Sequence, residues 1–352
     1  NFRAGVNAGN SIASGGNYNV VVGDVAGTAI TTGDQNVAVG YQALDALDTA
    51  IRNVAVGTTA LTSDTKGDAS VAVGHGALFT QNFTTSTSVY NTAVGYHAGV
   101  SVTTGKENSL VGALSGDALT TGNKNVALGH TALTSDTLGD RNVALGHTTL
   151  GTQNFTTSTD SYNVAVGYAA GAAVTTGQSN TLIGGNAGDA LTDSDFNTAV
   201  GMGALSSDTL GAESTAIGYL ALNAANSTTA TNAFNTAVGS RAGAAVTTGI
   251  NNVLIGGKAG DALTDADSNV AIGRSSLGAD TLGSASTALG HGTLSNQNFT
   301  TATDSFNVAV GYQAGNDITT GVKNTFVGGL AGDAYNTSCL LYTSDAADDV
   351  NG

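Results

Sequence analysis

One short motif recurs along the chain with a regular spacing, and this spacing constrains the fold more than any other feature. The motif reads Asn or Ser, any residue, a small or apolar residue, an aliphatic residue and Gly. Its glycines begin with Gly23, Gly40, Gly57, Gly74 and Gly95, at sequence intervals of 17, 17, 17 and 21, and this order then repeats as far as Gly328. The chain therefore contains 18 motif-bearing coils in superperiods of four, which is typical of a solenoid of tandem repeats.

The amino-acid composition and the charge of the chain argue against several classes of protein. Only 10% of the 352 residues are charged and 41% are apolar, with no Pro, which argues against disorder. No apolar run approaches the ~20 residues of a membrane helix, so we expect no membrane insertion. The formal charge of −16 disfavours nucleic acid as a partner. A single Cys excludes a disulfide framework and a Cys-based zinc site, and we expect neither a cofactor nor a metal.

The first and last motif positions have structural explanations. Asn occupies the first position in 15 of 18 coils, and stacked Asn side chains predict hydrogen-bonded amide ladders between coils about 4.8 Å apart. The invariant Gly predicts a turn with positive φ or a close backbone approach. The ladder and turn residues that open each superperiod are Asn19, Asn91, Asn163, Asn235 and Asn307, with Gly23, Gly95, Gly167, Gly239 and Gly311.

The middle of the motif predicts a strand that is apolar on both faces. The fourth position is always Val, Ile or Leu, which suggests a buried column, and the third is Ala in most coils. Successive side chains of a strand point to opposite faces, so positions two and four share one face. A strand that is apolar on both sides is usually covered on both sides, here by the chain's own second sheet and by another copy of the chain. We predict an all-β, parallel, flat and two-sided β-solenoid.

The register divides the chain into three segments. We expect residues 1–18 to form an irregular first coil with a truncated start, and residues 19–338 to form the repeat domain. The next motif Gly is due at residue 345, where Asp345 stands instead. The stretch C-L-L-Y-T-S-D-A-A-D resembles a translated sequencing adapter, so we interpret residues 339–352 as a non-native or disordered tail.

The strings N-T-A-V-G-Y-H-A-G (91–99), N-V-A-V-G-Y-A-A-G (163–171) and N-V-A-V-G-Y-Q-A-G (307–315) resemble two related sets of repeats. One set forms tail fibres of bacteriophages, often from marine samples, and the other forms the head of trimeric autotransporter adhesins. The resemblance covers roughly residues 19–335. It implies a left-handed β-roll, a homotrimer, and a structural, adhesive and non-catalytic role in host attachment through a surface glycan or protein receptor. The location would be a virion tail fibre or the extracellular cell surface.

Two alternatives remain open beside the tail-fibre interpretation. The first is the head of a cell-surface adhesin of the trimeric autotransporter type. The second, from another class, is a tailspike-type glycan depolymerase. Glycoside hydrolysis needs two carboxylates in a cleft. Glu occurs only at Glu107 and Glu213, and no coil departs from the register enough to build a cleft, which disfavours this alternative.

Every fourth coil carries four extra residues, and such insertions in a solenoid form loops that often make the binding face. Three of the loops share the string Q-N-F-T-T, and Ser227 replaces the aromatic residue in the remaining one. An exposed aromatic ring beside Asn and Thr suits stacking on sugar rings. The alternative is that each Phe folds back and caps its own loop. The candidate receptor-contact residues are Phe83, Phe155 and Phe299 with Asn82, Asn154 and Asn298.

Four histidines follow the motif Gly directly, in a position that Tyr often holds in other coils. They are His75, His130, His147 and His291. We expect them to cover the edge of a thin core, and the alternative is a metal site that three copies share on a threefold axis. The Asp-rich strings at 188–195 and 260–267 lack the Gly-rich nonapeptide of calcium β-rolls, so we expect solvated turns there.

Overall fold

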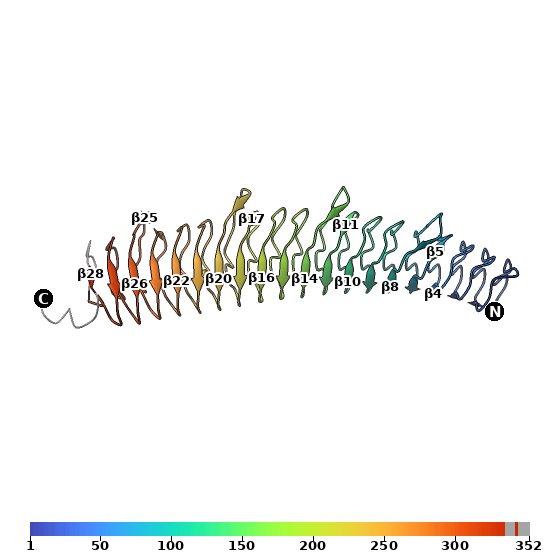
Figure 1. Cartoon of the computed structure of the whole chain (residues 1–352), viewed down its shortest axis with the longest axis horizontal. Coiled ribbons are helices and arrows are strands. Elements are labelled where there is room, and N and C mark those ends of the chain that lie inside the picture. Colours follow the sequence, from blue (N-terminus) through green and yellow to red (C-terminus); the bar gives the residue numbers. More distant parts are fainter. Residues whose placement is uncertain (335–341, 344–352) are drawn as a thin grey trace. The chain divides into compact units, whose positions relative to one another are not determined.

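The computed structural model describes residues 1–334 and 342–343 (Figure 1). These residues contain strands and turns but no helix, and they form a parallel β-solenoid of about 19 coils in which identical motif positions pair from coil to coil. The predicted fold class is therefore confirmed, while its handedness and its trimeric state stay predictions. The chain divides into two compact units, Asn1–Thr176 and Gly177–Gly352, which are described in turn.

Unit 1 contains one parallel ladder of three-residue strands, one strand from each coil. Its strands are β1 (Phe2–Ala4), β2 (Val20–Val22), β3 (Val37–Val39), β4 (Val54–Val56), β6 (Val71–Val73), β8 (Thr92–Val94), β9 (Ser109–Val111), β10 (Val126–Leu128), β12 (Val143–Leu145) and β14 (Val164–Val166). Phe2 of β1 pairs with Val20 of β2, so the segment before the regular repeats contributes the first strand of the ladder.

Unit 2 repeats the same ladder. Its strands are β15 (Thr181–Ile183), β16 (Thr198–Val200), β18 (Thr215–Ile217), β20 (Thr236–Val238), β21 (Val253–Ile255), β22 (Val270–Ile272), β24 (Thr287–Leu289), β26 (Val308–Val310), β27 (Thr325–Val327) and the two-residue β28 (Tyr342–Thr343). β28 pairs with β27, and the rest of the segment 339–352, for which a non-native or disordered tail was predicted, lies outside the described residues.

Each of the longer coils adds a second, shorter parallel pair of strands with the coil before it. These pairs are β5 (Gly67–Asp68) with β7 (Thr87–Ser88), β11 (Gly139–Asp140) with β13 (Thr159–Asp160), β17 (Gly211–Ala212) with β19 (Thr231–Asn232), and β23 (Gly283–Ser284) with β25 (Thr303–Asp304). Within unit 1 the loops at β5 and β11 project beyond the turns of the neighbouring coils (Figure 1).

The interior of each unit is filled by the third motif position, and the expectation that the fourth position is the buried column is wrong. The middle residue of every strand from β2 to β27 in the two long ladders is fully buried, as Ala38 and Leu110 illustrate. The fourth position, for example Val39 or Val56, stays half-buried or exposed on the outer face. Alternation fixes which residues share a face, but two apolar faces do not reveal which one is inside.

The Asn column is buried, but its hydrogen bonds run mainly to the backbone instead of forming the predicted amide ladder. Asn108 shows the pattern: its Oδ1 accepts from the backbone N–H of Asn125 and its Nδ2 donates to the carbonyl of Gly122, both at 2.9 Å. Direct amide contacts are longer, as between Asn142 Nδ2 and Asn125 Oδ1 at 3.2 Å. Most Asn side chains of the column, unlike Asn142, therefore satisfy buried backbone groups of their own coil and of the next coil.

The motif glycines allow neighbouring coils to approach closely. Gly95 has a φ of +145°, and a Cβ added there would lie 2.4 Å from the carbonyl oxygen of Gly112. Gly239, with a φ of +138°, meets Gly256 in the same way at 2.6 Å. Any side chain in this column would push two coils apart, which explains why Gly occupies the position in all 18 coils.

Candidate functional site

The inserted loops were the predicted contact surface, and a buried Asp anchors each of them from below. For the loop at residues 81–90, Asp64 Oδ1 accepts hydrogen bonds from the backbone N–H groups of Gly67 and Phe83, both at 3.0 Å. Gln81 Nε2 donates to Asp64 Oδ2 at 2.5 Å, and Gln81 Oε1 accepts from Asn91 Nδ2 at 2.8 Å. The Asp and Gln side chains thus tie the loop to the Asn column.

The same Asp–Gln pair occurs beneath two more loops, as Asp136 with Gln153 and Asp280 with Gln297, at 2.6 Å in both. Burial raises the pKa of Asp64 and of Asp136 above the ordinary value of 3.8, although the bonds from Gln and from backbone N–H groups act in the opposite direction. The loss of hydration outweighs these hydrogen bonds, so the folded protein destabilises the ionised form of both carboxyl groups.

The three loop phenylalanines are buried, which corrects the expectation that they present exposed rings to a sugar. Phe83, Phe155 and Phe299 are only 7%, 5% and 5% exposed. A Cβ added at Gly283 would lie 2.7 Å from Phe299 Cδ2, so that ring lies directly over a backbone that has no side chain. The arrangement is the alternative considered above, in which each Phe folds back under its loop and gains the free energy of apolar burial.

The asparagines beside these rings remain exposed. Asn82, Asn154 and Asn298 all lie at the surface. Each accepts a hydrogen bond through its Oδ1 from a Thr hydroxyl of the preceding coil, as Asn154 does from Thr137 Oγ1 at 2.9 Å. Around Asn82, Asn154 and Asn298 the loops therefore offer amides and hydroxyls, whereas the exposed aromatic rings of the loops lie at their last residues, Tyr90, Tyr162, Phe234 and Phe306.

The loop at residues 225–234 lacks both stabilising side chains. Ala225 stands in place of the Gln and Ser227 in place of the Phe, while Asp208 still accepts from the backbone N–H groups of Gly211 and Ser227 at 3.1 and 2.9 Å. Sequence reasoning missed the anchoring pair, although a signal was present. Asp64 and Gln81 lie one coil apart in the sequence, and this spacing recurs beneath the other loops that carry Phe.

Most of the His and Tyr residues that follow the motif Gly form short runs of stacked, exposed rings. His130 stacks on His147 with ring centroids 5.2 Å apart, and His147 stacks on Tyr168 at 5.7 Å. His75 with Tyr96 and His291 with Tyr312 make similar pairs at 5.5 and 5.4 Å. The expectation that these rings cover the core edge is therefore wrong for the four histidines, which point to solvent.

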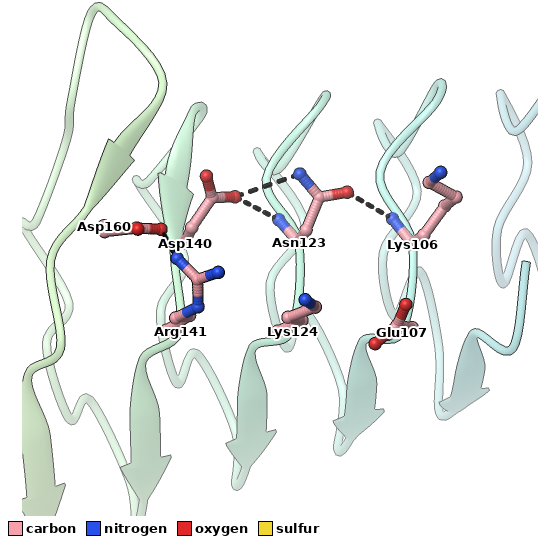
Figure 2. Close-up of a pocket in the computed structure, with 7 residues that line it drawn as sticks. All are labelled: Lys106, Glu107, Asn123, Lys124, Asp140, Arg141 and Asp160. Carbon is pink, nitrogen blue, oxygen red and sulfur yellow. Dashed lines mark hydrogen bonds and ion pairs between the residues drawn. The ribbon is translucent and has the colours of Figure 1, made fainter.

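A polar hollow of about 250 Å³ lies on the outer turns of unit 1 (Figure 2). It is lined by two rows of side chains from successive coils: Asp140, Asn123 and Lys106 in one, and Arg141, Lys124 and Glu107 in the other, with Asp160 at one end (Figure 2).

The charges of this hollow balance one another. Three cations face three carboxylates, and Arg141 forms an ion pair with Asp160. Asp140 Oδ1 accepts from the backbone N–H of Asn123, whose Oδ1 accepts from the backbone N–H of Lys106 at 3.0 Å. These contacts join coil to coil within the chain, so the hollow has an evident structural role and little unpaired charge to offer a ligand.

Residues 1–334 and 342–343 were searched for metal sites and for membrane-spanning helices. No group of three or more His, Cys, Asp or Glu side chains there is arranged to hold a metal ion. No helix there has the length and hydropathy to span a bilayer. Comparison of the chain with protein-family models, with curated proteins and with solved structures finds no match.

Proposed function

We propose that this chain is a segment of a structural, adhesive fibre that assembles as a parallel homotrimer and contributes to attachment to a host surface. The observation that carries the proposal is the fourth-position column on the outer face of the strand ladders, which is Val, Ile or Leu in coil after coil. Residues of this face that are 36–46% exposed include Val56, Val94 and Leu128 in unit 1 and Ile183, Ile217, Ile255, Leu289 and Val327 in unit 2.

A continuous apolar column is unusual on a soluble monomer, which rarely exposes a large contiguous apolar patch. A second copy of the same chain carries the same column with the same spacing between coils, so parallel copies match along their length. Burial of the stripe between copies gains about 25 cal/mol for each Å² removed from water. Trimerisation, which the family resemblance implies, would cover it.

The attachment role follows from what such an assembly presents to its surroundings. A solenoid of short, filled coils holds many polar turns and loops outward at regular intervals, which suits repeated weak contacts with a surface receptor. We propose a host glycan or protein as that receptor, no catalytic step, and a location on a virion tail fibre or on the outside of a cell.

Adhesion of cells to the immobilised full chain tests this role. A panel of intact bacterial cells in one arm and of eukaryotic cells in the other distinguishes a tail fibre, for which we expect bacterial capture, from an adhesin head that recognises eukaryotic surfaces. A trimeric, folded protein that captures neither would contradict an attachment role.

A further inference from the structure

Three cations lie together on successive coils of unit 2: Arg241, Lys258 and Arg274, called here the cationic patch. The backbone N–H of Lys258 donates to the carbonyl of Ser240 at 2.9 Å, and Ser275 donates to Gly257 at 3.0 Å, so the three coils are in register. Arg241 and Lys258 both stand two residues after a motif Gly and Arg274 one residue after. All three side chains are exposed.

Two members of the patch, Lys258 and Arg274, line a hollow of about 290 Å³ together with Ser240, Gly257 and Ser275, and Arg241 directly follows Ser240. The hollow exists because small residues occupy the position that rings occupy in neighbouring coils. A Cβ added at Gly257 would meet nothing closer than the carbonyl oxygen of Ser240 at 4.0 Å. The floor of the hollow is thus backbone and hydroxyl, and its rim is positive.

The positive charge of the patch is not balanced as it is in the hollow of unit 1. Within the described residues none of the three cations forms an ion pair. Burial raises the pKa of Asp261, and Lys258 and Arg241 act more weakly in the opposite direction, so this one carboxylate lies within electrostatic reach of two of the three cations. Like charges on the turns of adjacent coils repel, and here they persist in a chain whose formal charge is −16. The patch is a local region of positive potential on an otherwise acidic chain, and it attracts anions.

The fold does not require these charges. At the equivalent positions of other superperiods stand Gln313 for Arg241, Asn186 for Lys258 and Thr58 for Arg274. The backbone is the same at these positions: φ is +57° at Arg241 and +54° at Gln313. The repeat folds with uncharged residues at these positions in other superperiods. The three positive charges of this superperiod therefore have a reason other than folding.

Aromatic rings flank the hollow along the column that follows the motif Gly. Tyr219 is exposed on one side, and since Ser240 is its neighbour toward the hollow, no ring of the next coil covers that side. On the other side Arg274 Nε donates to His291 Nε2 at 3.3 Å, and His291 stacks on Tyr312. An aromatic face, hydroxyls and cations without an ion pair within four successive coils suit a sugar ring that bears an acidic group.

We propose that the cationic patch binds an acidic saccharide chain, with Lys258, Arg241 and Arg274 contacting its carboxylate or sulfate groups and Tyr219 stacking on a sugar ring. This inference rests on the proposed attachment role, since it names the chemical class of the receptor. Arg supplies paired N–H donors that match the oxygens of either acid group, and Lys supplies a point charge.

The test measures binding of the full chain to polygalacturonate, which carries carboxylates, and to dextran sulfate, with neutral dextran and polyphosphate as comparators. The variant R241Q/K258N/R274T introduces residues that the repeat already holds at these positions. We expect it to weaken binding of at least one acidic polysaccharide by about tenfold or more. Which polymer is affected distinguishes carboxylate from sulfate recognition.

The hollow of unit 1 supplies a matched control. The variant K106Q/K124S/R141A removes the same number of positive charges and also introduces residues found at equivalent positions. We expect it to bind the acidic polymers within about twofold of the unchanged chain, because its cations already face carboxylates. Equal losses in both variants would mean that net charge alone drives binding and would overturn the site.

A further variant, Tyr219→Ser, distinguishes recognition of a saccharide from binding of any anionic polymer. We expect it to weaken binding of the acidic polysaccharides by about threefold to tenfold and to leave polyphosphate binding unchanged. Full binding by R241Q/K258N/R274T, or equal affinity for neutral dextran, would overturn the proposal. A chain that captures cells but binds none of these polymers would contradict the site and leave the attachment role standing.

Discussion

Asp64 and Asp136 are the residues at which pH acts most directly on the fold. Burial raises the pKa of both above 3.8, so the folded chain binds these protons more tightly than the unfolded chain does. Stability from these two groups therefore rises as the pH falls from neutral through their raised values toward 3.8, and it is lost again as the pH rises. We expect urea unfolding of D64N/D136N to show a smaller gain on acidification than the unchanged chain shows. An equal or larger gain would contradict this assignment.

The buried phenyl rings predict a stability effect instead of a binding effect. Phe155→Ser introduces the residue that Ser227 provides in another loop, and it should lower the free energy of unfolding by about 3 kcal/mol through lost apolar burial. Binding of acidic polysaccharide should be unchanged. Asn154→Ser, at an exposed neighbour, should cost less than about 0.5 kcal/mol. If the folded Phe155→Ser variant bound acidic polysaccharide more weakly, the Phe155 ring would be a contact residue after all.

A buried Asn of the ladder should matter more than an exposed one. Asn108→Ala would leave the carbonyl of Gly122 and the backbone N–H of Asn125 without their partners, at a cost of about 2–4 kcal/mol for two buried groups. The exposed Asn82→Ala serves as the control. Urea unfolding of both variants checks the difference, and comparable stabilities would mean that water replaces the lost bonds.

At the scale of an element, the four inserted loops differ in how firmly they are held. The amides of Thr159 and Thr231 each donate to a carbonyl of the preceding coil at 3.3 Å, but only the loop of Thr159 has a Gln bridge and a buried Phe. We expect the amide of Thr231 to exchange with deuterium about tenfold faster, since local opening there breaks fewer contacts. The variant A225Q/S227F should remove the difference. Equal exchange in the unchanged chain would contradict the account.

The spacing of the motif predicts the register of these elements well, because parallel strands pair where identical motifs align, as Val37 does with Val54. Which face of the strand is buried was harder to predict, because apolar residues occupy both faces. The hydroxyl at the second position of many coils, such as Thr92 and Ser109, was the signal that this face lies outside. The burial of Phe83 depends on Asp64 and Gln81, which lie on two coils and meet only once the register is known. The cationic patch has a weaker signal in the sequence: Arg241 and Lys258 stand two residues after the motif Gly of consecutive coils, but Arg274 stands one residue after, so the three charges do not share one motif position.

At the scale of the whole molecule, the central claim is that the outer apolar face of the strands is an interface between copies of the chain. Leu128 in unit 1 and Leu289 in unit 2 are among its most exposed members. The variant L128D/L289D places a charge in each half of the stripe and should shift the assembly toward monomer without unfolding the coils, since neither side chain enters the core. Lys66→Asp, in the bend just before β5 and outside the long strand ladder, is the control.

Sedimentation equilibrium of the full chain at micromolar concentration tests this claim most directly. The account predicts a single species with three times the chain mass of 34.4 kDa, and a lower mass for L128D/L289D. A well-folded species with the mass of one chain would contradict it.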